Sequence, residues 1–107
     1  MTFDWDEQKN RRNFQKHGVW FEEAQTVWAD PYSTEFFDPD HSDGEDRFIR
    51  VGNSTRSRLL LVIFCERSDT ATRIISARKA TPKETKQHEE GIRLEEAQAP
   101  TWQAESG

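Results

Sequence analysis

Cysteine is almost absent from this chain of 107 residues, which has a single one, Cys65. One cysteine cannot form a disulfide within the chain, so we expect a fold held by its core in a reducing compartment. Cys65 lies in an apolar run, which favours a buried structural thiol. A nucleophilic thiol is the alternative, although no histidine lies near Cys65 in the sequence.

Apolar residues are also scarce. They make up 33% of the chain and charged residues another 33%, a balance that leans toward disorder. No apolar run could span a bilayer and no signal peptide is visible, so we expect no membrane contact and a cytoplasmic location. Four Trp and seven Phe in periodic runs still predict one small folded domain, residues 1–91, before a C-terminal extension, residues 92–107.

Motifs for cofactors and metals are missing. No Gly-x-Gly-x-x-Gly or phosphate-binding loop occurs, which argues against a nucleotide cofactor. There is no Cys-x-x-Cys or His-x-x-x-His pair, and three dispersed histidines do not predict a zinc site. The acidic loop Asp38–Glu45 lacks EF-hand spacing, which favours a solvated loop over a calcium site. We therefore expect no cofactor and no bound metal.

Charge is distributed unevenly along the chain, although its net value is -5. Seven carboxylates and no Lys or Arg lie between Asp30 and Asp46. Eight basic residues then follow between Arg47 and Lys79, against two acidic ones. The segment from Arg47 to Lys79 is also the part of the chain with the clearest β-strand pattern. The sequence therefore predicts a cationic sheet surface that could bind a polyanion.

Periodicity and turn residues predict an α+β fold with the element order β-α-α-β-β-β-β-α. Asp6 as N-cap and Gly18 past the C-terminus bound the first helix. Strands joined by short loops are antiparallel, so we expect an antiparallel sheet of four to five strands, with the helices on one face and the other face partly open. The expected strands span residues 2–6, 33–37, 46–52, 59–65 and 72–77, and the expected helices span 7–17, 21–29 and 81–90.

Three histidines and the strand arginines are the candidates for chemistry. His17 ends the first helix, where it either interacts with the helix dipole or serves as a general acid or base. His88 is either a surface residue of the last helix or a second acid–base group, and His41 is expected to be solvated. A regular strand would place Arg73 and Arg78 on opposite faces, so at least one should pair with a carboxylate or lie at a helix-facing edge.

Several motifs in order resemble the BrnT toxin family. The N-terminal part has the pattern Phe3-x-Trp5-Asp6-Glu7-x-Lys9-Asn10-x-x-Asn13, followed by Lys16-His17-Gly18-Val19-x-Phe21-Glu22-Glu23-Ala24. The middle has Asp30-Pro31, Asp38-Pro39-Asp40-His41-Ser42-x-Gly44-Glu45-x-Arg47 and Val51-Gly52-x-Ser54. Glu66-Arg67 and Arg73-Ile74-Ile75-Ser76-Ala77-Arg78-Lys79-Ala80-Thr81 complete it. The resemblance covers about Phe3 to Gly91, most of the chain.

This resemblance implies a RelE-like fold, ribonuclease activity on RNA, and a cognate antitoxin of the BrnA type. It also implies that DNA is bound only through the toxin–antitoxin complex, which could be a dimer or a heterotetramer. Two positions depart from the family pattern. His88 stands where a Tyr is expected in the last helix, and Trp20 stands where a smaller, more polar residue is expected.

RNA cleavage without a metal needs a group that deprotonates the 2′-hydroxyl, cations that stabilise the phosphorane, and a proton donor for the leaving 5′-oxygen. Arginine suits the second task because its fork matches phosphate oxygens. We therefore nominate Arg67 and Arg78 as catalytic phosphate clamps, with His17 and His88 competing for the acid–base role. The expected RNA contacts are Lys79, Arg58, Arg73 and Lys9.

Two other functions compete with this hypothesis. The chain could be a non-enzymatic binding module that pairs with a small DNA-binding regulator, since net negative charge slows encounter with RNA. It could also be a decayed toxin that keeps the fold and the antitoxin contact but has lost catalysis, as the His88 departure would allow.

Overall fold

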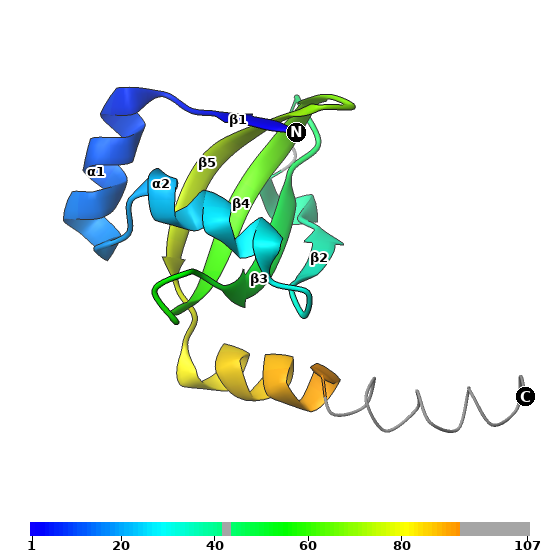
Figure 1. Ribbon diagram of the computed structural model, residues 1–107. Coiled ribbons are helices and arrows are strands. Elements are labelled where there is room, and N and C mark those ends of the chain that lie inside the picture. The colour runs from blue at the N-terminus through cyan, green and yellow to red at the C-terminus, as the bar shows by residue number, and fades with distance from the viewer. Residues whose placement is uncertain (42–43, 93–107) are drawn as a thin grey trace, which may run out of the picture.

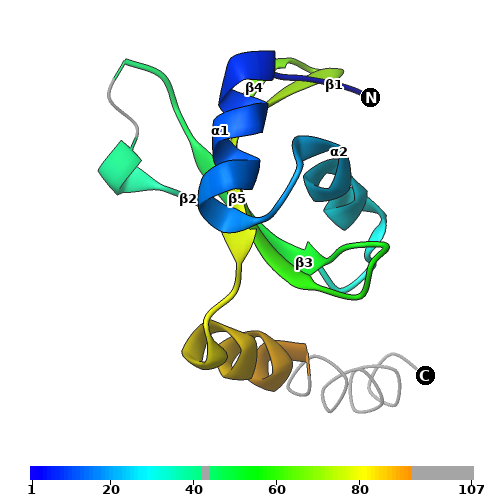
Figure 2. The same ribbon diagram turned by 90° about the vertical axis from the view of Figure 1, so that its left-hand side faces the viewer.

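The computed structural model describes residues 1–41 and 44–92, in which a five-stranded sheet is flanked by helices (Figure 1). A last helix, residues 82–92, follows the final strand and lies beyond the end of the sheet (Figures 1 and 2). The other elements are β1 (Thr2–Asp4), α1 (Glu7–His17), α2 (Phe21–Ala24), the 3-10 helix η1 (Gln25–Ala29), β2 (Thr34–Phe37), the 3-10 helix η2 (Pro39–His41), β3 (Phe48–Asn53), β4 (Leu59–Ser68) and β5 (Ala71–Lys79).

The sheet has the strand order β1-β5-β4-β3-β2 and is mixed rather than antiparallel throughout. The meander β2 to β5 is antiparallel, as the short loops predicted. β1 pairs with β5 in parallel, which corrects the expected all-antiparallel sheet. The expectation fails for β1 because three helical segments separate it from β2, so no short loop constrains its direction.

The core lies on one face of the sheet, which we call the core face. Leu60, Val62 and Ile74 are buried there against Phe21 of α2 and Val27 of η1. These five side chains are at most 1% exposed, and each contributes about 1.5–3 kcal/mol relative to an exposed position. Figure 1 shows α2 and the helical turn after it crossing this face of the sheet.

Helix α1 begins and ends where local signals predicted. The Asp6 carboxylate accepts hydrogen bonds from the backbone N–H groups of Gln8 (2.8 Å) and Lys9 (3.1 Å), and the bond from Lys9 is the main cause of a lowered Asp6 pKa. Gly18 has φ 71°, and its N–H donates to the Phe14 carbonyl at 2.8 Å. Glycine adopts this left-handed conformation without steric cost, so it ends the helix.

Two buried asparagines attach α1 to the rest of the fold. Asn13 Nδ2 donates to the Ala77 carbonyl at 2.8 Å, and Asn13 Oδ1 accepts from the Ala77 N–H at 3.2 Å. Asn10 Oδ1 accepts from the Phe21 N–H at 2.8 Å, while its Nδ2 donates to Glu22 at 2.7 Å. Asn13 thus satisfies backbone groups of β5 where β1 no longer pairs with that strand, and it holds α1 beside β5.

The last helix does not join the other helices on the core face, which corrects the expectation that all helices cover one face. Its residues Glu84 and His88 instead line a pocket over the opposite face of the sheet. The helix runs through Gly91 to residue 92, and the expected C-terminal extension lies outside the described residues from there on.

Cys65 is free and 1% exposed, and burial raises the pKa of its thiol, as expected of a structural cysteine. No helix in the described part of the chain is long and apolar enough to cross a membrane.

Candidate functional site

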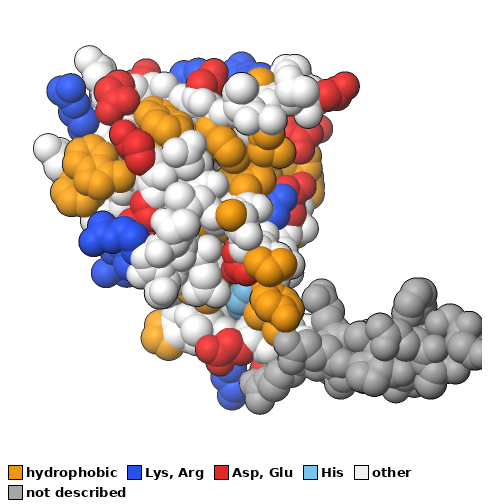
Figure 3. Space-filling model, in the orientation of Figure 1, with side chains coloured by type: hydrophobic (Ala, Val, Ile, Leu, Met, Phe, Trp, Pro, Cys, Tyr) orange, Lys and Arg blue, Asp and Glu red, His pale blue; other side chains and the backbone are white. Residues whose placement is uncertain are grey.

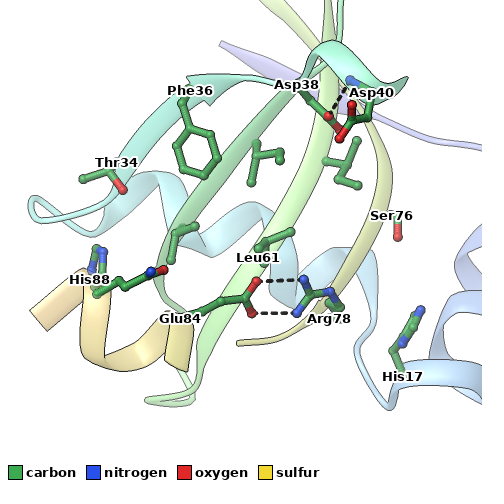
Figure 4. A pocket seen from close by; sticks show the side chains of 14 residues that line it. His17, Thr34, Phe36, Asp38, Asp40, Leu61, Ser76, Arg78, Glu84 and His88 are labelled. Carbon is green, nitrogen blue, oxygen red and sulfur yellow. Dashed lines mark hydrogen bonds and ion pairs between the residues drawn. The ribbon is translucent and has the colours of Figure 1, made fainter. Parts of the chain in front are cut away.

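The second face of the sheet forms the floor of a pocket of about 710 Å³ (Figure 4). Cross-strand partners share a face, and the registers bring alternate residues of four strands together here. Ile49, Val51, Leu61 and Ile63 of the central strands form the apolar floor, with Phe36 on the side of β2. The pocket therefore lies on the face of the sheet that α2 and η1 leave uncovered, and the last helix forms one of its walls.

A guanidinium–carboxylate pair lies in the middle of this pocket. Arg78 of β5 donates to Glu84 of the last helix through Nη1 (2.8 Å) and Nη2 (2.9 Å), and Nη1 also reaches the Lys79 carbonyl at 3.2 Å. The hydrogen bonds from Arg78 are the main cause that lowers the pKa of Glu84 to about 2, and the pair also raises the pKa of Arg78. Glu84 further caps the helix, because the Thr81 N–H donates to its Oε1 at 2.8 Å.

The two candidate histidines lie at opposite ends of the pocket. Figure 4 shows His17 on one side, His88 on the other, and the Arg78–Glu84 pair between them. His17 is half-buried at the end of α1, whereas His88 is 8% exposed on the last helix. The sequence alone left these two histidines as competitors, and the structure places both in one pocket with Arg78.

A cationic groove runs from the His17 end of this pocket between α1 and β5. Lys9, Arg12 and Lys16 line it together with His17 and Ser76. His17 and Ser76 also line the pocket, so the groove and the pocket meet at these two residues. Among the residues the structure describes, the three basic side chains of the groove have no ion pair and remain available to an anion.

The expected convergence of several guanidinium groups on one patch is not observed. Arg67 lies next to Glu45 at 3.7 Å, Arg73 next to Asp4 at 3.6 Å, and Arg58 is paired with Glu23. Arg67 is also far from Arg78. The register partner of Arg78 is Leu61, and Arg67 lies six residues farther along β4, which corresponds to about 20 Å. Lys79 is exposed and its register with Leu60 directs it to the core face. Figure 3 shows basic and acidic side chains interspersed on the face it depicts.

A register irregularity in β5 changes one further expectation. The pairs Ile63–Ser76 and Phe64–Ile74 leave Ile75 as an extra residue, a β-bulge. Arg73 and Arg78 are thereby placed on the same face by register, rather than on opposite faces as a regular strand would require. The bulge lies beside Ser76, where the pocket and the groove meet.

The sequence profile of the family described as "Ribonuclease toxin, BrnT, of type II toxin-antitoxin system" matches residues 5–84, most of the chain. The chain belongs to this family. It is also similar to the 1.1 Å crystal structure of the Brucella abortus ribonuclease toxin BrnT, with 26% sequence identity and a TM-score of 0.57. That alignment covers 76% of this chain and 97% of the Brucella toxin. No match was found among curated protein sequences.

The BrnT family match includes the whole groove and the Arg78–Glu84 pair, and it ends before His88. In this member of the BrnT family, the sequence predicted that Lys9 contacts RNA. It did not predict the same for Arg12, Lys16 and Ser76, which line the same groove. The signal for the two helical residues was present, since Lys9, Arg12 and Lys16 recur at three- and four-residue spacing on one side of α1. Nothing in the sequence separated Ser76 from its neighbours before the bulge and the register were known.

The described residues of this BrnT fold contain no group of three or more His, Cys, Asp or Glu side chains arranged to hold a metal ion. Where the groove meets the pocket, the groups that could hold a ligand are cationic, hydroxyl and imidazole groups, and the pocket adds carboxylates and an apolar floor. Such a set can bind a phosphodiester and exchange protons with it.

Acid should weaken the attachment of the last helix through Glu84. A carboxyl whose pKa is lowered by folding contributes stability above its ordinary pKa, and this contribution is lost as the pH falls toward the folded value. For Glu84 the window runs from 4.5 down to about 2. Because the pair is partly open to solvent, Glu84→Gln should cost about 1 kcal/mol at neutral pH and almost nothing near the lower limit. Urea unfolding of both proteins across this window measures the difference, and a difference independent of pH would contradict the assignment.

Proposed function

We propose that this chain is an endoribonuclease toxin that cleaves RNA without a metal ion where the groove meets the pocket. The observation that carries the proposal is that His17 and Ser76 line both the cationic groove and the pocket that contains Arg78. A phosphodiester seated there would have a titratable ring, a hydroxyl group and a guanidinium group around it. The family match supports RNA as the substrate.

The three tasks of metal-free cleavage can be assigned to these groups. His17 exchanges a proton with the 2′-hydroxyl or the leaving 5′-oxygen, because imidazole both accepts and donates protons near neutral pH. Arg78 stabilises the charge that develops on the phosphorane. Lys9, Arg12 and Lys16 hold the flanking phosphates of the strand. The product would be a 2′,3′-cyclic phosphate.

Arg78 can bind a phosphate while it remains paired with Glu84. A guanidinium has five N–H donors, and three of them are used by Glu84 and the Lys79 carbonyl. The other two, on Nε and Nη2, have no partner within residues 1–41 and 44–92. These two N–H groups lie along one edge of the planar guanidinium, where their spacing matches two phosphate oxygens. Glu84 then orients Arg78, much as a neighbouring group orients a catalytic base.

Two arginines nominated by the sequence provide a direct test. Arg78→Ala should lower kcat/KM for a defined RNA in EDTA by about 10²–10³-fold, by analogy with loss of one oxyanion donor. Arg67→Ala, which removes an exposed arginine paired with Glu45, should remain within about threefold of wild type. Gel-based cleavage rates for the three proteins give the comparison. Equal activity of Arg78→Ala and wild type would remove Arg78 from the proposed site.

The partners proposed from the family are an antitoxin of the BrnA type and, through that antitoxin, DNA. We further propose that the chain acts in the cytoplasm and that the complex is a dimer or a heterotetramer. The type II toxin–antitoxin family supports the existence of an antitoxin. Exposed aromatic side chains on β2, Phe36 and Phe37, also leave apolar surface that a protein partner could cover.

One observation favours the alternative of a non-enzymatic binding module. The strand arginines Arg50, Arg73 and Arg78 each lie beside a carboxylate, which reduces the positive charge that the sheet presents to RNA. The groove on α1 argues the other way because its cations are not paired with carboxylates in the part of the chain described. Expression without a partner separates the two functions, since a nuclease toxin arrests growth and depletes RNA, whereas a binding module does neither.

A further inference from the structure

His88 has a buried polar atom that nothing in the described structure satisfies. Its side chain is 8% exposed, and Nε2 has no hydrogen-bond partner among residues 1–41 and 44–92. A buried imidazole nitrogen normally finds a partner in the folded protein, because an unsatisfied polar group is costly to bury. His88 also lines the pocket, at the end away from His17 (Figure 4). This combination indicates a ligand that supplies the missing hydrogen bond.

The same end of the pocket offers an exposed aromatic ring. Phe36 is 49% exposed and lines the pocket beside the apolar floor, where its register partner is Ile49. Figure 4 shows Phe36 and Thr34 on the side of the pocket nearest His88. Aromatic rings over an apolar floor bind flat, partly polar molecules, and the pocket volume lies within the usual range for small ligands.

This end is continuous with the place where the phosphodiester is proposed to bind. Arg78 lies between His17 and His88, so a nucleotide whose phosphate contacts Arg78 can direct its base toward Phe36. We propose that this end of the pocket binds one unpaired nucleobase, stacked on Phe36 and hydrogen-bonded to His88 Nε2. The inference rests on the proposed function, since it specifies how the same site holds its RNA.

The charge of the pocket selects a base over a second phosphate. Asp40 and Glu84 line the pocket but not the groove, so the pocket disfavours a second anion more than the groove does. A nucleobase is neutral and has an apolar face that can stack on Phe36. The cations are instead on the groove side, where the ribose–phosphate backbone would run. A base in the pocket and the ribose–phosphate backbone in the groove therefore agree with the distribution of charge.

Binding of matched RNA oligomers tests this subsite without requiring turnover. One oligomer carries every base and the other has an abasic sugar next to the phosphate at which the wild type cleaves. Both lack the 2′-hydroxyl that attacks this phosphate, so neither is cleaved during the titration. If that phosphate cannot be mapped, a set of oligomers with the abasic sugar at each position is used. The wild type should bind the intact oligomer about 5–150-fold more tightly than the matching abasic one, the range expected for stacking of one base. Calorimetric titration gives both affinities.

Three variants test which side chains cause the difference in affinity between the intact and the abasic oligomer. Phe36→Ala and His88→Leu should each bind intact and abasic oligomers with nearly equal affinity, because the intact oligomer loses its advantage. Phe37→Ala is the matched control, since Phe37 is 48% exposed but its register places it on the opposite face of β2. It should keep the wild-type discrimination. Thermal melting confirms that each variant is folded, and His88→Leu tests the subsite independently if Phe36→Ala is not.

The outcomes separate this inference from the proposed function. Equal binding of intact and abasic oligomers by a wild type that cleaves RNA overturns the subsite and leaves the nuclease. Discrimination that survives in both Phe36→Ala and His88→Leu also overturns it. A wild type that discriminates but does not cleave supports the subsite and refutes the nuclease. If the wild type binds neither oligomer while an antitoxin peptide binds in a Phe36-dependent manner, the end of the pocket is a protein contact and the inference is wrong.

Discussion

Replacing His17 with Gln is expected to lower kcat for RNA cleavage by about 10²–10⁴-fold, the usual contribution of a general acid or base. Glutamine keeps a polar side chain at the junction of the groove and the pocket, but its amide cannot exchange protons near neutral pH. KM should change little, because Lys9, Arg12 and Lys16 still hold the strand. Rates at saturating RNA, together with KM, measure both quantities.

The control for this variant is Gln15→Ala, an exposed position on the same helix that lines neither the pocket nor the groove. It should cleave at the wild-type rate. Because His17 is the last residue of α1, thermal melting should accompany the kinetics to detect loss of a favourable helix-end interaction. A folded His17→Gln protein with a wild-type kcat would exclude His17 from proton transfer.

Replacing Glu23 with Ala is expected to destabilise the fold by about 3 kcal/mol, because one partner of a largely buried ion pair is removed. Glu23 is 7% exposed and accepts hydrogen bonds from Arg58 Nε at 2.9 Å and from the Ser54 hydroxyl at 2.7 Å. Arg58 also donates to the Gly18 carbonyl at 3.1 Å, so this network joins the α1–α2 connection to the β3–β4 turn. For a domain of this size the loss corresponds to a fall in Tm of more than about 10 °C.

This network also has a defined pH dependence. The hydrogen bond from Arg58 is the main cause that lowers the pKa of Glu23, so its stabilisation is complete above the ordinary carboxyl range and is lost as the pH falls below it. Glu45→Ala is the control, since Glu45 and Arg67 are 39% and 48% exposed and 3.7 Å apart. It should change stability by less than about 1 kcal/mol. Equal effects of the two substitutions in calorimetric melting would contradict the role given to Glu23.

The parts of the fold that local signals determine could be predicted to the residue. Asp6 and Gly18 bound α1 because capping needs only the residues next to the helix, and the structure confirms the range Glu7–His17. The antiparallel meander followed from its short loops. The parallel pairing of β1 with β5 could not be predicted this way, because the two strands are joined through most of the chain and their contact depends on tertiary packing.

The candidate site was predictable only in part for the same reason. Basic residues at helical spacing mark the groove on α1, and His17, Arg78 and His88 were nominated before the structure placed them in one pocket. The neutralising partners of the arginines come from other elements, as Glu84 does for Arg78, so charge counting along the chain overstated the cationic character of the sheet. The bulge at Ile75 further altered which side chains share a face.

The chemistry of the RNA ends tests the central claim most directly. Purified wild-type protein is incubated with a defined RNA oligomer in excess EDTA, and the fragments are analysed by mass spectrometry. Cleavage by His17 and Arg78 without a metal predicts a 2′,3′-cyclic phosphate on one fragment and a 5′-hydroxyl on the other. Cleavage that stops in EDTA and returns with a divalent cation, giving 3′-hydroxyl and 5′-phosphate ends, would contradict the account.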